Sequence, residues 1–167
     1  MKAYRIKDVK NFMGKLLGSE SFDSFLLAEG TITTYNTFVI DGHMVKEFFV
    51  GDVNDDNKLP PYEFSEWKAM RSLCFDLIKG KKTPSSFKFV LLLSPQNLER
   101  TLSSIQSSFT GNDITGVFLN IRFHNQQLIL TTGISYRIFS VDKTLDNEWD
   151  RLVKQFLKQH EIAFEEL

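Results

Sequence analysis

The sequence contains little of what most catalytic and metal sites are built from. Its 167 residues include one cysteine, Cys74, and three histidines. A single cysteine excludes an internal disulfide and any multi-cysteine zinc or iron–sulfur site. His43, His124 and His160 are far apart, and none has a nucleophile at catalytic spacing. Glycine-rich phosphate loops are absent too. The sequence therefore predicts no catalytic residue and no cofactor.

Three further absences concern the environment of the chain. No apolar run approaches the roughly 20 residues of a membrane span, and residues 1–5 lack the apolar core of a signal peptide. A formal net charge of −1 gives no overall field, so nucleic acid or anionic lipid would need a local basic patch. Cys74 stands between Leu73 and Phe75, which favours a buried thiol over a reactive one. We expect a cytoplasmic protein with no membrane partner.

What the sequence does contain is phenylalanine and regular periodicity. Sixteen phenylalanines and a hydrophobic fraction of 42% predict a thick core in one domain spanning residues 1–167. The patterns predict helices over 9–17, 63–79, 95–109 and 144–157. They predict strands over 3–6, 25–40, 44–50, 87–93, 117–123 and 128–138, with Asp41-Gly42 turning a hairpin.

This order reads as β-α-β-β-α written twice, which predicts an α+β fold. The helices that end the two halves begin with Glu66-Trp67-Lys68 and Glu148-Trp149-Asp150. They indicate a pseudo-duplication of residues 1–82 and 86–162, with a mainly antiparallel sheet and helices on one face. The alternative is that a two-layer α+β protein reaches this order by chance.

Four stretches, taken in order, resemble an uncharacterised bacterial family classed as a domain of unknown function. They are residues 34–42, 77–84, 118–123 and 149–154. The resemblance covers essentially the whole chain and implies a bacterial, cytoplasmic, single-domain protein, but it assigns no site.

The second half also resembles, more loosely, the repeating unit of DNA sliding clamps. The likeness rests on the helix start Ser94-Pro95 and the hairpin that ends in residues 131–136. It implies a clamp-like variant of the fold. The tryptophan-bearing helices have no counterpart in clamps, and the chain is too short for a ring-forming clamp subunit.

The segment from Asp52 to Glu63 follows the spacing of a calcium-binding loop. Oxygen ligands fall at the first, third, fifth and twelfth positions, which are Asp52, Asn54, Asp56 and Glu63. Pro60 and Pro61 stiffen the part that would fold around Ca²⁺. A solvated acidic turn is the alternative interpretation.

A run of lysines is the second candidate site. Lys79 ends the helix predicted over 63–79, and Lys81, Lys82 and Lys88 come after it, with Arg122 and Arg137 expected on the outward faces of neighbouring strands. Such cations could bind phosphates of nucleic acid or another anion. Lysines at a helix end also complement the helix dipole, which is the alternative explanation.

Two classes of function remain open at this stage. The first is a non-catalytic binding module that presents a sheet face or hairpins to a protein partner, a second copy or nucleic acid, including a clamp-like role. The second is an enzyme for a small molecule with a dispersed site drawn from Glu29, Tyr35, Arg122 and Arg137. Glu29, among apolar residues, is the candidate for a carboxylate of raised pKa; exposure at a sheet edge or pairing with a lysine is the simpler interpretation.

Overall fold

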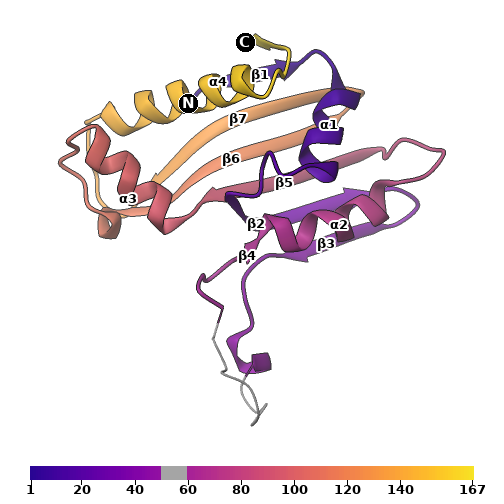
Figure 1. Ribbon diagram of the computed structural model, residues 1–167, viewed down its shortest axis with the longest axis horizontal. Coiled ribbons are helices and arrows are strands. Elements are labelled where there is room, and N and C mark those ends of the chain that lie inside the picture. Colours follow the sequence, from indigo (N-terminus) through magenta and orange to yellow (C-terminus); the bar gives the residue numbers. More distant parts are fainter. Residues whose placement is uncertain (50–59) are drawn as a thin grey trace.

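A computed structural model describes residues 1–49 and 60–167 and shows an α+β fold around one antiparallel sheet. Within this part of the chain the sheet has eight strands, ordered β3-β2-β5-β6-β7-β1-β8, with the short β4 also paired to β2 (Figure 1). The strands are β1 (Ala3–Ile6), β2 (Phe25–Thr33), β3 (Thr37–Asp41), β4 (Ser65–Glu66), β5 (Ser86–Leu93), β6 (Ile114–His124), β7 (Gln127–Tyr136) and β8 (Phe164–Glu166).

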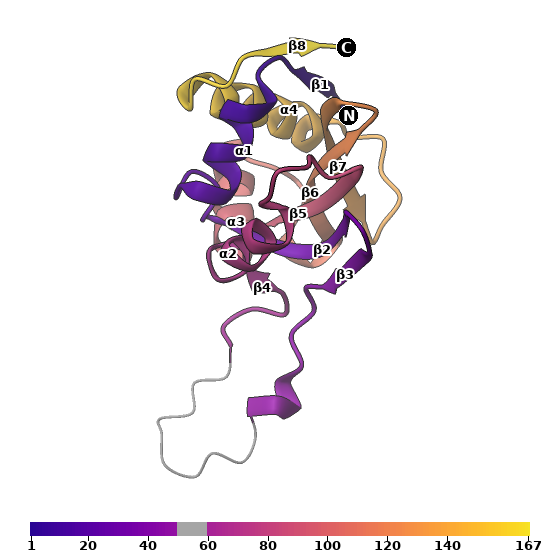
Figure 2. The ribbon, with the colours of Figure 1, turned by 90° about the vertical axis from the view of Figure 1, so that its right-hand side faces the viewer.

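The helices are α1 (Val9–Gly18), α2 (Trp67–Ile78), α3 (Pro95–Ser104) and α4 (Thr144–Gln159), and they lie on one side of the sheet (Figure 2). Their apolar stripes pack on the inward side chains of the strands. The Trp67 ring contacts Phe89, and the Trp149 ring contacts Phe25. Both tryptophans are buried.

Local signals in the sequence placed most of these elements correctly. Asp8 caps α1 by accepting a hydrogen bond from the Asn11 amide, and Ser94 caps α3 in the same way. The strands predicted over 117–123 and 128–138 are β6 and β7, which form a hairpin joined at residues 125–126. The α+β prediction, with an antiparallel sheet and helices on one face, is confirmed.

The predicted turn at Asp41-Gly42 is wrong. The chain turns earlier, at residues 34–36, so that β2 pairs with β3 from Thr33↔Thr37 to Glu29↔Asp41. Gly42 continues alongside β2, and its amide donates to the Ala28 carbonyl. A Cβ on Gly42 would lie 1.8 Å from the Leu27 carbonyl oxygen, so glycine serves close approach of two backbones here.

The predicted return strand over 44–50 is wrong as well. Residues Lys46–Phe49 form a short 3₁₀ helix, η1, and residue 50 lies outside the described residues. The helix predicted from residue 63 begins only at Trp67, because Ser65 and Glu66 pair with β2 as β4. The helix predicted to reach Phe109 ends at Ser104, and β8 was not predicted.

The two halves repeat the element order but occupy the sheet differently. β5 lies between β2 and β6, whereas β1 lies between β7 and β8. The first strands of the two halves therefore have different neighbours. The pseudo-duplication of residues 1–82 and 86–162 stays a prediction.

Three connections meet at one end of the sheet. Thr33 of β2 pairs with Ser86 of β5, and Ser86 pairs with His124 of β6. The β2–β3 turn, the α2–β5 connection and the β6–β7 turn are consequently neighbours at this end. The predicted lysine run begins here.

Candidate functional site

The connection from α2 to β5 carries three of the predicted cations and is fixed at both ends. At its start the Lys79 amide donates to the Phe75 carbonyl, and Gly80 follows with a φ of 148°, which side chains rarely tolerate. At its end the Ser85 amide donates to the Thr33 carbonyl, and Pro84 is buried. Lys79, Lys81 and Lys82 are exposed between these anchors.

This connection forms one wall of an open groove of about 670 Å³, named here the lysine groove. The opposite wall is the first turn of α1, and the β6–β7 turn contributes Gln126. The floor is apolar and the rim is basic. The apolar residues are Val9, Met13, Ile78, Pro84, Phe87 and Phe123; the cations are Lys10, Lys79, Lys81 and Lys82.

The charged side chains that line the groove are all positive. None of the described residues that line it is an aspartate or a glutamate. Lys79 pairs with Asp76 at 2.9 Å, but both side chains are more than half exposed, so the pair contributes little. Within the described residues no carboxylate lies within ion-pair distance of Lys10, Lys81 or Lys82. The rim is therefore a concentration of uncompensated positive charge.

An aromatic ring stands on the other side of the same connection. The Lys82 ammonium lies 5.6 Å from the centre of the Tyr35 ring, within the range of a cation–π contact. Tyr35 is 84% exposed, which is unusual for so large a ring. A second hollow of about 480 Å³ lies between Tyr35, Leu77 and the lysines, so the connection is a basic ridge with a hollow on each side.

The other predicted cations lie elsewhere. Lys88 and Arg122 are directly paired across β5 and β6, on the sheet face away from the helices. The Lys88 ammonium binds Glu29 at 2.5 Å, which agrees with the simpler interpretation of Glu29. Arg137 follows the far end of β7, roughly 30 Å along the strand from Gln126. Its side chain donates to the Asn112 carbonyl.

The lysine groove therefore unites Lys79, Lys81 and Lys82 with Lys10, which sequence reasoning missed. Lys10 is one exposed lysine on a helix, and its spacing from the lysine run carries no signal. Only the packing of α1 beside α2 places it on the opposite wall.

The predicted calcium loop lies mostly outside the described residues, which include neither Asp52, Asn54 nor Asp56. Glu63 is described and exposed, and its carbonyl accepts from the Met44 amide. The described residues contain no cluster of three metal-binding side chains. The calcium site stays a prediction.

The residues offered for an enzyme site do not meet in the structure. Glu29 and Arg122 lie on the outer sheet face, Tyr35 lies at one end of the sheet, and Arg137 lies at the other. Cys74 lies on the buried face of α2, and burial raises its thiol pKa to about 12. The burial of Cys74 confirms the expectation of a buried thiol, and at the raised pKa the reactive thiolate is scarce at neutral pH.

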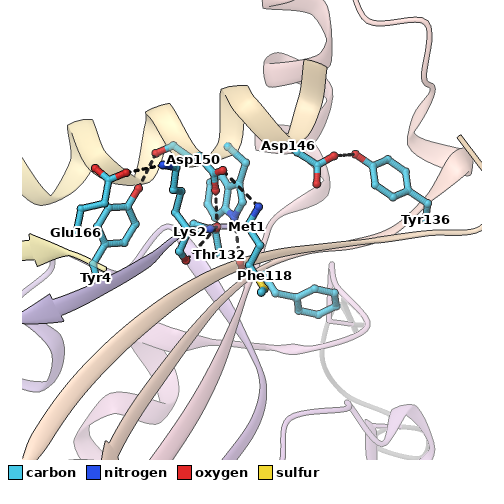
Figure 3. Close-up of polar contacts among 10 residues, drawn as sticks. Met1, Lys2, Tyr4, Phe118, Thr132, Tyr136, Asp146, Asp150 and Glu166 are labelled. Atoms are coloured by element: carbon cyan, nitrogen blue, oxygen red, sulfur yellow. Dashed lines mark hydrogen bonds and ion pairs between the residues drawn. The ribbon is translucent and has the colours of Figure 1, made fainter. Parts of the chain in front are cut away.

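A second polar cluster ties the chain ends to α4 (Figure 3). The buried Thr132 hydroxyl donates to Asp150, and the Lys2 amide donates to the Thr132 oxygen at 2.8 Å. Glu166 accepts from Lys154 at 2.7 Å and from Lys2 at 2.6 Å. These hydrogen bonds, led by that from Lys154, lower the Glu166 pKa to about 2. The cluster holds β1, β7 and β8 against α4, which is a structural role.

Comparison with known proteins identifies the family. The family model of DUF5721, a family of unknown function, matches residues 15–165. The chain belongs to DUF5721. The resemblance seen in the sequence is thereby confirmed, and this DUF5721 protein remains of unknown function. No curated protein and no solved structure matches it, so the likeness to sliding clamps stays a prediction. Within the described residues of this DUF5721 chain, no helix is long and apolar enough to cross a membrane.

Proposed function

We propose that this protein is a non-catalytic module that binds a phosphate-bearing ligand in the lysine groove. The observation that carries the proposal is the pairing of a basic rim with an apolar floor, without a carboxylate among the described lining residues. Phosphates favour clustered ammonium groups, and a floor of aliphatic and aromatic side chains suits the flat face of a base. A volume of about 670 Å³ is in the usual range of ligand sites.

The ligand of this chemistry is a nucleotide, either free or within a single strand of nucleic acid. Tyr35 supports the nucleotide rather than a simple phosphate, because its exposed ring stands beside Lys82 and can stack on a base. Lys81 and Lys82, on the ridge between both hollows, are placed to contact phosphates on either side.

Binding of three probes tests the proposal. Fluorescence anisotropy would follow a labelled nucleotide and labelled single-stranded oligonucleotides of increasing length, with inorganic phosphate as competitor. We expect binding at low salt that weakens with added salt, since phosphate contacts release counterions. Affinity that rises with oligonucleotide length assigns the strand as the ligand. Equal affinity for the free nucleotide assigns the nucleotide.

The matched variants separate the groove from general charge. Lys81→Glu combined with Lys82→Glu should lower the affinity at least tenfold and reduce its salt dependence. Lys143→Glu combined with Lys158→Glu makes the same change of net charge at two exposed lysines outside both hollows, and it should leave the affinity nearly unchanged. If no probe binds at low salt, or if both variants bind like wild type, the proposed function is wrong.

The setting we propose is the bacterial cytoplasm. Its support is the sequence resemblance to a bacterial family and the single buried thiol, which fits a reducing compartment. A nucleotide ligand is also abundant there. Fractionation of cells that express a tagged full-length chain should recover it in the soluble cytoplasmic fraction, and recovery with the membranes or the medium would contradict this setting.

A further inference from the structure

The two edges of the sheet differ in how well they are protected. β8 closes one edge with three residues, and its two glutamates form ion pairs with Arg5, Lys2 and Lys154. β3 is the outermost strand at the other edge, and Figure 1 shows no described segment alongside its outer side. β3 reads Thr-Phe-Val-Ile-Asp, without the lysine or proline that usually guards an exposed edge.

The backbone groups that β3 leaves unpaired can be assigned. The Asn36 carbonyl accepts from the Thr34 amide and the Gly42 amide donates to Ala28, so even-numbered residues point their backbone groups toward β2. Because these groups alternate along a strand, Thr37, Val39 and Asp41 present theirs outward. A strand that pairs with β3 must bind these three residues.

The side chains of β3 are also exposed to an unusual degree. Val39 is 76% exposed and lies on the outer sheet face, opposite Thr31. Phe38, opposite the buried Ile32, lies on the helix-covered face and is still 37% exposed. Leu73 of α2, in a stripe with Met70 and Leu77, is 47% exposed. Exposed apolar side chains therefore lie beside the unpaired backbone groups of β3.

We propose that β3 pairs with β3 of a second copy of this chain, antiparallel and centred on Val39. This register uses the outward backbone groups, because Val39 meets Val39 of the other copy and Thr37 meets Asp41. On the helix-covered face it places Phe38 beside Ile40 of the other copy. No like charges face each other, and every apolar side chain finds an apolar neighbour.

The charge pattern favours a second copy in this register over continued growth of the sheet. Pairing of β3 with β8 would leave open edges at both ends and form a filament, and it would place Val39 against a strand rich in glutamate. Pairing of β3 with itself is closed by its twofold axis. The result is one continuous sheet across a dimer, with β8 at both outer edges.

The mass of the intact chain in solution tests the proposal, by sedimentation over a range of concentrations. We expect a concentration-dependent dimer. Val39→Lys should raise the dimer dissociation constant at least tenfold, because it places two ammonium groups directly opposite each other. Val45→Lys, at an exposed valine outside β3, is the matched control and should leave it unchanged. A wild-type chain that stays monomeric, or a Val39→Lys variant that dimerises normally, overturns the proposal.

A cysteine variant keeps the test decisive if Val39→Lys fails to fold. Under mild oxidation Val39→Cys should yield a disulfide-linked dimer, since residues opposite each other in a ladder lie within disulfide reach. Val45→Cys should not, and the buried Cys74 should not interfere. Absence of the Val39→Cys dimer contradicts the register centred on Val39. Loss of dimerisation would leave ligand binding in the lysine groove intact, so the two proposals fail separately.

Discussion

Single residues in this chain can have a role that their sequence context conceals. Asp41-Gly42 has the composition of a hairpin turn, yet Gly42 has no positive φ and instead lets the chain pass close to β2. The real turn, at residues 34–36, contains no glycine at all. The dipeptide alone cannot distinguish a glycine that makes a turn from one that lets two backbones approach closely. The second role depends on a neighbouring strand that is distant in the sequence.

The two glycines Gly42 and Gly14 should respond oppositely to alanine. Gly42→Ala brings a methyl group against the Leu27 carbonyl, and we expect it to lower the free energy of unfolding by about 1–3 kcal/mol. Gly14→Ala adds a methyl into open space on α1 and should raise it by about 0.5–1 kcal/mol. Urea unfolding measures both. A Gly42→Ala protein as stable as wild type would contradict the close approach.

At the scale of elements, the sequence predicted correctly those helix starts that depend on contacts between residues close together in the chain. Ser94-Pro95 and Asp8 start helices by hydrogen bonds within one turn, so their sequence suffices. β4 and β8 were missed because two or three residues carry no periodicity, and their pairing partners are distant. The lysine run was visible in the sequence, but its groove was not, since Lys10 joins it only through helix packing.

The link between β8 and α4 should weaken in acid. Hydrogen bonds from Lys154 and Lys2 lower the Glu166 pKa from 4.5 to about 2 in the folded chain. A depressed carboxyl pKa stabilises the fold above the unfolded value, and this contribution is lost as the pH falls through that window. Glu166→Gln should therefore be less stable than wild type at neutral pH, and the difference should shrink as the pH falls from about 4.5 toward 2.

Urea unfolding at several pH values measures this difference, and the control is a carboxylate without such contacts. Glu99 is exposed on α3 and has no ion pair with a described residue. We expect Glu99→Gln to differ little from wild type across the same range. A Glu166→Gln deficit that is equally large at pH 7 and in acid would show that the charge of Glu166 is not its source.

At the scale of the whole molecule, the apolar core and the clustered lysines lie in different places. The helix-covered face holds one continuous apolar core, and the formal net charge is only −1. The uncompensated lysines nevertheless gather at one end of the sheet, beside the turns that meet there. A net charge near zero therefore coexists with a local basic site. The composition had not excluded such a site, because it gives only the total charge.

Cys74 should report opening of the whole core. Its side chain is fully buried, and its raised pKa disfavours the reactive thiolate. In the native protein we expect a disulfide reagent such as DTNB to modify it very slowly, at a rate that rises with urea in step with unfolding. Full modification within seconds under native conditions would show that α2 opens independently of the sheet.

The position of β1 has a consequence for how the chain is made. β1 pairs with residues 129–131 of β7 and with residues 164–166 of β8. During synthesis on the ribosome, β1 therefore cannot form its first ladder until β7 has emerged, nor its second until β8 has emerged. β2 meets β5 much sooner. We infer that the ladders form first in the middle of the sheet, where β2 meets β5, and that β1 joins the sheet late.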